Sequence, residues 1–298
     1  MGLKDRQQNV VDIPHCPVHG PRVGRALGLL VPRLPPAADF PLAFWVQSGA
    51  QLTLVVKAKP PLATAWFDAA LGEALGGVGI EGLWLHGNPS AGAQLFTKRG
   101  WQHLWGRGWS TTAQGLRHGP AAFQQLVSQL YEAALDEAEA FLAPAARDGI
   151  VDLYCGVGAS VVRWQRRGGR VLGVELDGNA VACARVNAPA AEILRGGCAQ
   201  RLPQLRTWLE AGTFEERLGY LNPPRTGLEP AVTAWLASHR PLARLAYLSC
   251  SPNTLARDLG LLEAGGYRVV RLVPWDFFPH TRHVETLALL ARVEPDPP

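Results

Sequence analysis

The chain has 298 residues, 47% of them hydrophobic, and its formal net charge is +4. This composition is typical of a globular protein with a substantial core, and the mild basic excess permits a nucleic-acid partner without requiring one. We expect no membrane attachment, because no run approaches the roughly 18 apolar residues that a transmembrane helix needs. The N-terminus, MGLKDRQQNVVDI, has no signal-peptide core, so we expect a cytoplasmic protein.

The cysteines are scattered and form no C-x-x-C pair, which argues against a disulfide framework or a zinc ribbon. One of them, Cys16, lies in HCPVHG beside His15 and His19. So small a cluster supplies too little sulfur and imidazole for a convincing metal site. We therefore expect neither a metal ion nor an iron–sulfur cluster.

The first 115 residues predict a small α+β domain. Its opening stretch, residues 1–36, is rich in proline and predicts loops. Six of the ten tryptophans lie in the first 110 residues, where they serve either as core residues or as platforms for unpaired bases. The local patterns predict a hairpin over 44–57, a helix over 60–75, and strands over 80–86 and 94–105.

The remainder, residues 116–298, predicts a second domain of a different kind. After a long helix the pattern becomes strand, turn, helix, strand, which is typical of a mostly parallel sheet with helices on both faces. The fold class is therefore α/β, with a Rossmann-like sheet whose last strand is antiparallel. We predict strands at 150–154, 171–175, 192–195, 218–221, 245–248, 267–272 and 285–293, and helices at 124–142, 160–167, 179–187 and 254–262.

A strand that runs into a glycine turn, DLYCGVG at 152–158, indicates a nucleoside-binding edge. Glycine lets the backbone approach a ligand closely. A dinucleotide fingerprint needs a third glycine where this chain has Val161, so NAD is disfavoured. Glu175, at the end of the next strand, can accept hydrogen bonds from both hydroxyls of a ribose. Asp152, the turn and Glu175 together favour S-adenosyl-L-methionine.

Cys250 stands between a predicted buried strand and a helix that begins near Pro252, in RLAYLSCSPNTLARD. Ligands bind at this edge of open α/β sheets. A helix N-terminus also lowers the pKa of a thiol, so Cys250 is a candidate nucleophile. Free cysteine is among the most buried residue types as well, and the local sequence leaves a small core residue as an equal alternative.

Four motifs, DLYCGVG, LNPPRTG, YLSCSPNTLARDL and FFPHTRHVETLALL, follow one another in this chain. Their identity and order resemble the S-adenosylmethionine-dependent RNA uracil-C5 methyltransferases of the TrmA/RumA type. The resemblance covers residues 116–298, with a weaker echo in VVDIPHCPVHGP. It implies a class I methyltransferase fold and transfer of a methyl group to C5 of a uridine in tRNA or rRNA. It does not say which RNA or which uridine.

The resemblance also implies roles for single residues. Cys250 matches the nucleophile of the family, and Glu285 in HVET matches its general base. A thiolate that adds to uracil C6 makes C5 nucleophilic, and a base must then remove the C5 proton before the thiol leaves. Matches to cofactor contacts are Gln124, Tyr154, Gly156, Gly158, Glu175 and Asn222. The target base must be flipped or unpaired, and the weaker candidates to hold it or its RNA are Phe123, Arg225, Phe277, Phe278 and His280. Arg225 and Arg257 either contact phosphate or hold loops.

The chain departs from the family pattern at several positions. Asn222 stands where the family has the aspartate of D-P-P-R, and an amide both donates and accepts where a carboxylate only accepts. Gln125-Leu126 replaces V-N, and Ala159 replaces a polar residue after the glycine turn. No RNA-binding barrel is recognisable in the N-terminal part, so RNA contacts are expected from residues 1–110 or from the cleft itself.

Two alternatives keep the fold and change the function. Asn222-Pro-Pro resembles the N-P-P motif of exocyclic-amine methyltransferases, in which asparagine and a backbone carbonyl bind an amino group. Those enzymes carry an aromatic residue where this chain has Arg225, and they need no cysteine. A catalytically silent RNA-binding homologue is the second alternative. Asn222 and Ala159 motivate it, whereas Cys250 and Glu285 oppose it.

Overall fold

The computed structural model describes residues 2–4, 10–12, 20–92, 94–122, 127–239, 241–278, 281 and 283–293. Contacts divide the chain into two compact units, 1–121 and 122–298. The short strands β7 (Ser110–Thr111) and β8 (Arg117–His118) pair with each other, which keeps both in the first unit. In the described part of the chain no helix combines the length and the apolar character needed to span a membrane.

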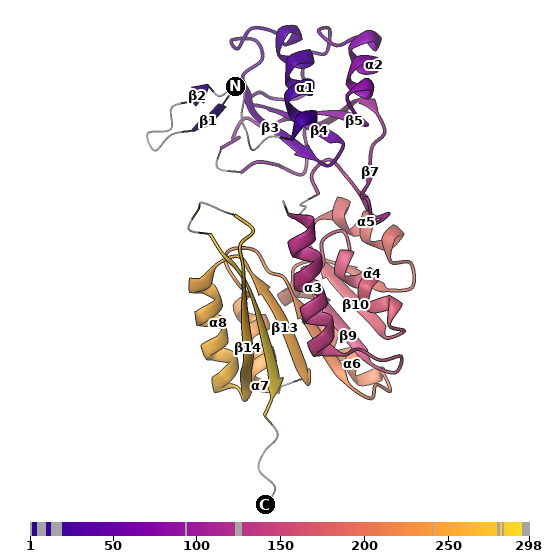
Figure 1. The fold of residues 1–298 in the computed structure, drawn as a ribbon, viewed down its shortest axis with the longest axis vertical. Coiled ribbons are helices and arrows are strands. Elements are labelled where there is room, and N and C mark those ends of the chain that lie inside the picture. The colour runs from indigo at the N-terminus through magenta and orange to yellow at the C-terminus, as the bar shows by residue number, and fades with distance from the viewer. Residues whose placement is uncertain are drawn as a thin grey trace, which may run out of the picture. The chain divides into compact units, whose positions relative to one another are not determined.

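The first unit is built on a four-stranded sheet in the order β3-β4-β5-β6 (Figure 1). The hairpin predicted around Ser48-Gly49 is confirmed, with Ser48 opposite Gln51. Strand β5 runs parallel to β4 and β6 runs antiparallel to β5. The elements are β1 (Gly2–Lys4), β2 (Val10–Asp12), α1 (Pro21–Leu30), η1 (Val31–Arg33), β3 (Leu42–Ser48), β4 (Gln51–Val56), α2 (Ala69–Gly77), β5 (Gly82–Gly87) and β6 (Trp101–Gly106).

Three predictions for the first unit are wrong. The strand expected over 94–105 begins only at Trp101. Helix α1 occupies part of the stretch expected to be loop, because Pro21 stands in its first turn, where no backbone donor is required, and Ala26 and Leu30 are buried in the core. Helix α2 begins at residue 69 instead of 60. The Asp68 side chain accepts from the Leu71 amide at 2.8 Å and caps the helix there.

The second unit is a seven-stranded sheet in the order β11-β10-β9-β12-β13-β15-β14. Only β15 runs opposite to the other six strands, as predicted for the last strand, and it lies between β13 and β14. The start of β15 therefore lies at the edge where the parallel strands end. The elements are α3 (Ser128–Leu142), β9 (Gly149–Leu153), α4 (Ala159–Arg166), β10 (Arg170–Glu175), α5 (Gly178–Asn187), β11 (Glu192–Arg195), α6 (Cys198–Ala211), β12 (Arg217–Leu221), α7 (Pro230–His239), β13 (Arg244–Ser249), α8 (Pro252–Ala264), β14 (Tyr267–Trp275) and β15 (Glu285–Arg292).

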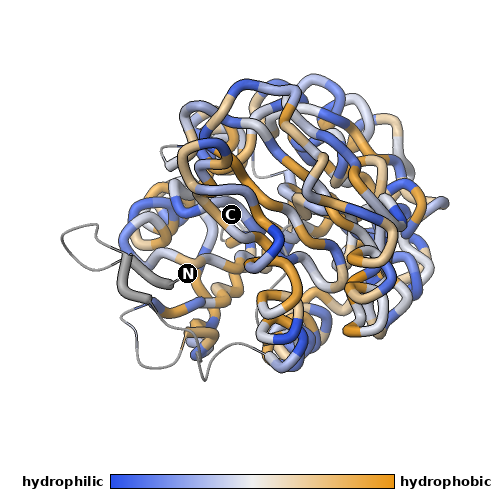
Figure 2. The backbone as a smooth tube through the Cα atoms, turned by 90° about the horizontal axis from the view of Figure 1, so that it is seen from above, coloured by the Kyte–Doolittle hydropathy of each residue, from blue (hydrophilic) through white to orange (hydrophobic). Residues whose placement is uncertain are grey.

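The sheet of the second unit has a core on each face. Helices α3, α4 and α5 pack on one face and helices α6, α7 and α8 on the other. The central strands are buried on both faces, which explains why their sequences are continuous apolar runs instead of alternating ones. In Figure 2 hydrophobic and hydrophilic stretches alternate along the coiled parts of the backbone tube, as expected for helices with one buried face. Helices α6 and α7 were not predicted, and Pro203 inside α6 is a residue that normally signals a helix end.

Candidate active site

Cys250 follows β13 directly and precedes α8, so it stands at the carboxyl edge of the sheet as predicted from its sequence. In the antiparallel pair of β13 and β15, Ser249 lies opposite Thr286. Cys250 is the residue directly after Ser249, and Glu285 is the residue directly before Thr286, so each lies one position beyond this pair at the same edge of the sheet. The Glu285 carboxylate acts electrostatically on the Cys250 thiol, consistent with this placement. The thiol and the carboxylate thus share one small region.

The Cys250 thiol and the Glu285 carboxyl differ in exposure to solvent. Cys250 is half-buried and free, whereas Glu285 is only 3% exposed. Its burial therefore raises the pKa of the Glu285 carboxyl to about 7, which Arg225 partly offsets. A carboxyl group of this kind exchanges protons near neutrality, as a general base should.

The expectation that the helix N-terminus lowers the pKa of Cys250 is wrong. Burial raises the pKa of this thiol, the Glu285 carboxylate raises it further, and Arg225 lowers it. Desolvation of the half-buried sulfur is the largest cause, and the Glu285 charge adds to it because a like charge disfavours the thiolate. The positive charge that favours the thiolate therefore comes from Arg225.

Asn222 and Arg225 belong to the loop between β12 and α7, next to the nucleophile strand. The Asn222 backbone amide donates to the Leu153 carbonyl at 3.2 Å, which places the residue beside the end of β9. Arg225 is exposed, and its guanidinium lowers the pKa of the Cys250 thiol, so it lies near the sulfur. One loop thus reaches from the glycine turn after β9 to the cysteine after β13.

The glycine turn after β9 has the backbone that its sequence demands. Tyr154, Gly156 and Gly158 all have positive φ, of 62°, 56° and 83°. A side chain on Gly158 would meet the Cα and Cβ of Ala184 at 3.2 Å, whereas nothing lies within 4 Å of the Cβ position of Gly156. The open side of the turn is therefore at Gly156, where a ligand can approach the backbone.

Glu175 fixes this turn and retains acceptor capacity. Its Oε2 accepts from the Gly156 amide at 3.0 Å and its Oε1 from the Asp177 amide at 2.7 Å. A carboxylate has about four acceptor sites, so both oxygens can still accept from ribose hydroxyls. An acid at the end of the second strand beside an open glycine turn fits S-adenosylmethionine.

Not every candidate lies at this edge. Asp152 is fully buried, and its Oδ2 accepts from the Trp164 indole at 2.8 Å, so it belongs to the packing between β9 and α4. Phe277 is 1% exposed and part of the interior. Phe278 is half-buried and makes an edge contact with His283, with ring centroids 6.0 Å apart. Phe123, Gln124 and His280 lie outside the described residues.

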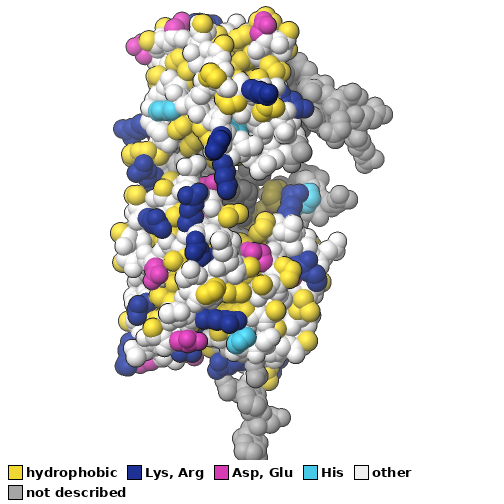
Figure 3. Space-filling model, turned by 180° about the vertical axis from the view of Figure 1, so that it is seen from behind, with side chains coloured by type: hydrophobic (Ala, Val, Ile, Leu, Met, Phe, Trp, Pro, Cys, Tyr) yellow, Lys and Arg dark blue, Asp and Glu magenta, His cyan; other side chains and the backbone are white. Residues whose placement is uncertain are grey.

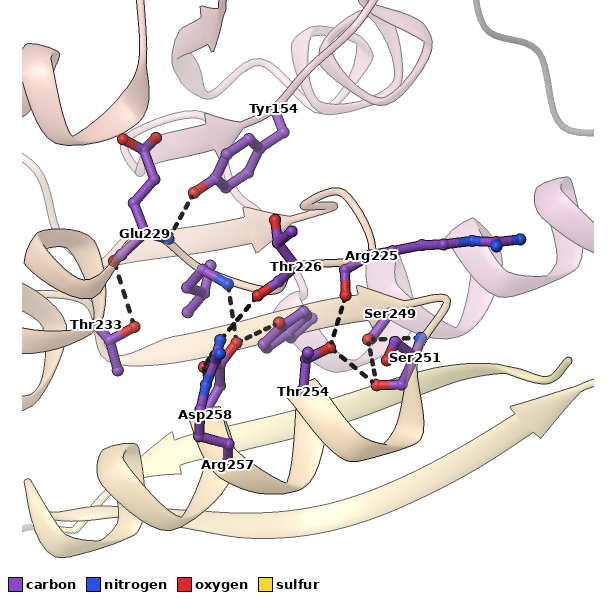
Figure 4. Close-up of polar contacts among 12 residues, drawn as sticks. Tyr154, Arg225, Thr226, Glu229, Thr233, Ser249, Ser251, Thr254, Arg257 and Asp258 are labelled. Atoms are coloured by element: carbon purple, nitrogen blue, oxygen red, sulfur yellow. Dashed lines mark hydrogen bonds and ion pairs between the residues drawn. The ribbon is translucent and has the colours of Figure 1, made fainter. Parts of the chain in front are cut away.

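The loop from Asn222 to Glu229 is held in place by α8 and β13. The sequence predicted only that Arg257 either contacts phosphate or holds a loop, and it gave no role to Asp258. Figure 4 shows Thr254, Arg257 and Asp258 of α8 turned toward this loop. Asp258 is 1% exposed and stands on the same helix face as the buried residues Leu255, Leu259 and Leu262. An acid on an otherwise apolar helix face is the signal that would have identified it.

Comparison with known proteins places this site in a family. A family model described as tRNA (Uracil-5-)-methyltransferase matches residues 207–293. A 23S rRNA (uracil(1939)-C(5))-methyltransferase of Acidithiobacillus ferrooxidans is 31% identical over 98% of this chain and 67% of its own length. The chain belongs to the RNA uracil-C5 methyltransferase family. This is a family of S-adenosylmethionine-dependent enzymes, and the motifs that carry Cys250 and Glu285 fall inside the matched region.

One further relative and one solved structure are similar to this chain. An RNA methyltransferase of Thermosynechococcus vestitus is 32% identical over 95% of this chain and 65% of its own length. The crystal structure of a tRNA (uracil-54, C5)-methyltransferase of Pyrococcus abyssi, in complex with S-adenosyl-L-homocysteine, has the same fold, with a TM-score of 0.72 and 23% identity. It covers 97% of this chain and 72% of the archaeal chain. The chain spans between about a third and two thirds of the length of the curated relatives it matches.

Proposed function

We propose that this member of the uracil-C5 methyltransferase family transfers a methyl group from S-adenosylmethionine to C5 of a uridine in tRNA or rRNA through a covalent Cys250 adduct. The observation that carries the proposal is a half-buried thiol directly after β13 and a buried carboxyl of raised pKa at the start of the adjacent strand β15, whose charge acts on that thiol. An amino-group methyltransferase needs neither of these groups.

The cofactor supplies an electrophilic methyl group. Glu175 is suited to accept from its ribose hydroxyls, the Gly156 backbone to approach it closely, and Tyr154 to line its pocket. Tyr154 is well anchored for this purpose, because its hydroxyl accepts from the Glu229 amide at 3.3 Å. Gln124 remains a candidate contact from the sequence.

The residues of this chain then divide the chemistry between them. The Cys250 thiolate adds to C6 of the flipped uracil, the C5–C6 double bond opens, and the electron pair makes C5 nucleophilic. After C5 is methylated, the Glu285 carboxylate removes the C5 proton, the double bond re-forms and the thiolate leaves. Arg225 stabilises the thiolate at the start and at the end of this cycle.

Asn222 bears on which base is accepted. It follows β12, which lies between β9 and β13, and so stands between the predicted cofactor and nucleophile positions. An amide can donate to a carbonyl oxygen of uracil and accept from its N3–H, so asparagine is compatible with this base. The exocyclic-amine alternative uses the same amide for an amino group but leaves Cys250 and Glu285 without a role.

An isotope experiment separates the proposal from both alternatives. The protein is incubated with methyl-labelled cofactor and with RNA that carries tritium at uracil C5. Tritium release in step with methyl incorporation is the expected result. Methyl transfer without tritium release would support the exocyclic-amine alternative, and RNA binding with neither signal would support the silent homologue.

Replacing Cys250→Ala tests the covalent route directly. Removal of the nucleophile is expected to abolish turnover and the denaturation-resistant RNA–protein adduct, while cofactor binding persists because the glycine turn is untouched. Cys183→Ala is the matched control, since Cys183 is also a buried cysteine but lies in helix α5 and not after β13. Undiminished methylation by Cys250→Ala would exclude the covalent mechanism.

A further inference from the structure

Asp258 is a buried carboxylate that accepts four hydrogen bonds, all from the loop after β12, from β13 and from its own helix. Its Oδ2 accepts from the Leu228 amide at 2.9 Å and from the Tyr247 hydroxyl at 2.8 Å. Its Oδ1 accepts from Nε and Nη2 of Arg257 at 2.9 and 2.8 Å. A carboxylate that is 1% exposed and so fully engaged fixes the position of every group that donates to it.

Further bonds run from the same helix face to the loop. Arg257 Nη2 also donates to the Thr226 carbonyl at 2.9 Å, and Thr254 Oγ1 donates to the Arg225 carbonyl at 3.2 Å. A side chain on Gly227 would meet Asp258 Oδ2 at 2.5 Å and Arg257 Nη2 at 2.6 Å, so the loop lies directly against the helix. The backbone of residues 225–228 is thus held against α8 along its whole length (Figure 4).

The held loop carries a functional side chain. Arg225 extends from it, and the charged groups that act on the Cys250 thiol are Arg225 from the loop and Glu285 from β15. Cys250 itself precedes α8 by two residues. Helix α8 is therefore connected both to the nucleophile, through the chain at its N-terminus, and to Arg225, through the hydrogen bonds to the loop.

We propose that Asp258 is a positioning residue that holds the loop between β12 and α7 on helix α8 and so keeps the Arg225 guanidinium beside the Cys250 sulfur. This role deepens the proposed function, on which it rests. Asp258 itself touches no reacting atom. Its effect passes through the Arg225 backbone to the guanidinium, which partly offsets the effects of burial and of Glu285 on the pKa of the thiol.

The test measures the thiolate instead of the overall reaction. The rate of Cys250 alkylation by iodoacetamide is followed against pH by peptide mass spectrometry, which separates Cys250 from the other cysteines. Asp258→Asn preserves the volume of the side chain but weakens its hold on Arg257 and the loop. We expect the alkylation midpoint to move upward by about half a unit to one unit, and the rate at pH 7 to fall about three- to tenfold.

A double-mutant cycle shows whether the effect passes through Arg225. Arg225→Ala is expected to shift the midpoint by at least as much, and the double variant should shift no further than Arg225→Ala alone. Additive shifts would overturn the proposal, as would an unshifted midpoint in Asp258→Asn. Asp148→Asn is the matched control, because Asp148 is also buried and accepts from two backbone amides, but before β9, at the opposite end of that strand.

A milder variant covers the case in which Asp258→Asn does not fold. Thr254→Val keeps the shape of the side chain and removes the hydroxyl that donates to the Arg225 carbonyl. It should shift the alkylation midpoint upward by a smaller amount, and an unchanged midpoint in this folded variant would also overturn the proposal. Because alkylation needs no RNA, its result stands apart from the methylation assay. A shifted midpoint without uracil methylation would overturn the function and leave the loop-holding role intact.

Discussion

At the scale of single residues, the site is defined by two acidic groups, a thiol and a carboxyl, whose environments raise their pKa values. Glu285 is buried at the start of β15, and its pKa is raised to about 7 from an ordinary value of 4.5. Proton abstraction from C5 requires the carboxylate form. Below pH 7 most of the Glu285 population carries a proton and cannot act as the base, whereas above pH 7 the ionised form predominates.

The methylation rate should therefore rise with pH through about 7. In Glu285→Gln the base is absent, so turnover should fall about 10²- to 10⁴-fold, and a methylated covalent RNA–protein adduct should accumulate because the C5 proton cannot leave. Gel shift under denaturing conditions measures the adduct, and single-turnover kinetics measures the rate. Glu210→Gln, an exposed position in α6, is the control. A Glu285→Gln enzyme with the normal rate and pH profile would place the base elsewhere.

At the scale of elements, strand β9 and helix α4 are joined through Asp152, a residue that the sequence motif had suggested as part of the cofactor site. Asp152 is fully buried, and burial raises the pKa of its carboxyl to about 7 from an ordinary value of 3.8. Between these two values the folded chain retains a proton that the unfolded chain has released. The folded state therefore binds more protons, and the free energy of unfolding falls as pH rises from about 4 to about 7.

The variant Asp152→Asn should remove this pH dependence while still accepting from the Trp164 indole. The unfolding free energy of the unmodified protein should fall between pH 4 and pH 8 because of Asp152, and that of the variant should not. The difference in unfolding free energy between the two proteins should therefore change by an amount on the order of a few kcal/mol between these pH values, in favour of the variant at pH 8. Urea titrations at both pH values give the comparison. Asp39→Asn, at an exposed position in the first unit, is the control. A difference that does not change with pH would mean that Asp152 is ionised inside the folded protein.

At the scale of the whole molecule, the basic excess belongs to one unit. Residues 1–121 contain eleven lysines and arginines against six aspartates and glutamates, whereas residues 122–298 contain eighteen against nineteen. Lysine and arginine side chains are spread over the face drawn in Figure 3. Within the first unit the guanidinium of Arg117 lies 4.5 Å from the Trp109 ring centroid and that of Arg107 lies 5.8 Å from it. Arginines beside an aromatic ring suit RNA, because they pair with phosphate and stack on bases.

We therefore predict that the first unit supplies RNA affinity without supplying chemistry. Replacing Arg107 and Arg117 with Gln should weaken RNA binding at physiological salt, and the slope of log affinity against log salt should become shallower by about one for each phosphate that the protein no longer neutralises. Fluorescence anisotropy at several salt concentrations measures both. Arg25→Gln, exposed on α1, is the control. A loss in log affinity in the double variant that is only twice the loss in the single control would show that only the overall charge matters.

Local sequence determined much of the second unit. The alternation of strands and helices, the glycine turn at 156–158 and the cysteine between β13 and α8 were all predictable, because buried strands and turn residues leave signals within a few positions. The four motifs were sufficient to indicate the family. In the first unit the hairpin was predictable for the same reason. Helix α1 was not, since Pro21 and the prolines that flank the helix resemble those of a loop.

The tertiary structure alone decided which side chains meet and what their surroundings do to them. The insertion of β15 between β13 and β14 brings Glu285 beside Cys250, and no local pattern encodes that order. Burial then reversed the expected direction of the Cys250 pKa and placed Asp152 in the interior. The hold of Asp258 on the loop joins residues thirty positions apart. Desolvation and long-range contacts depend on the packed chain as a whole, so they have no signature in a short stretch of sequence.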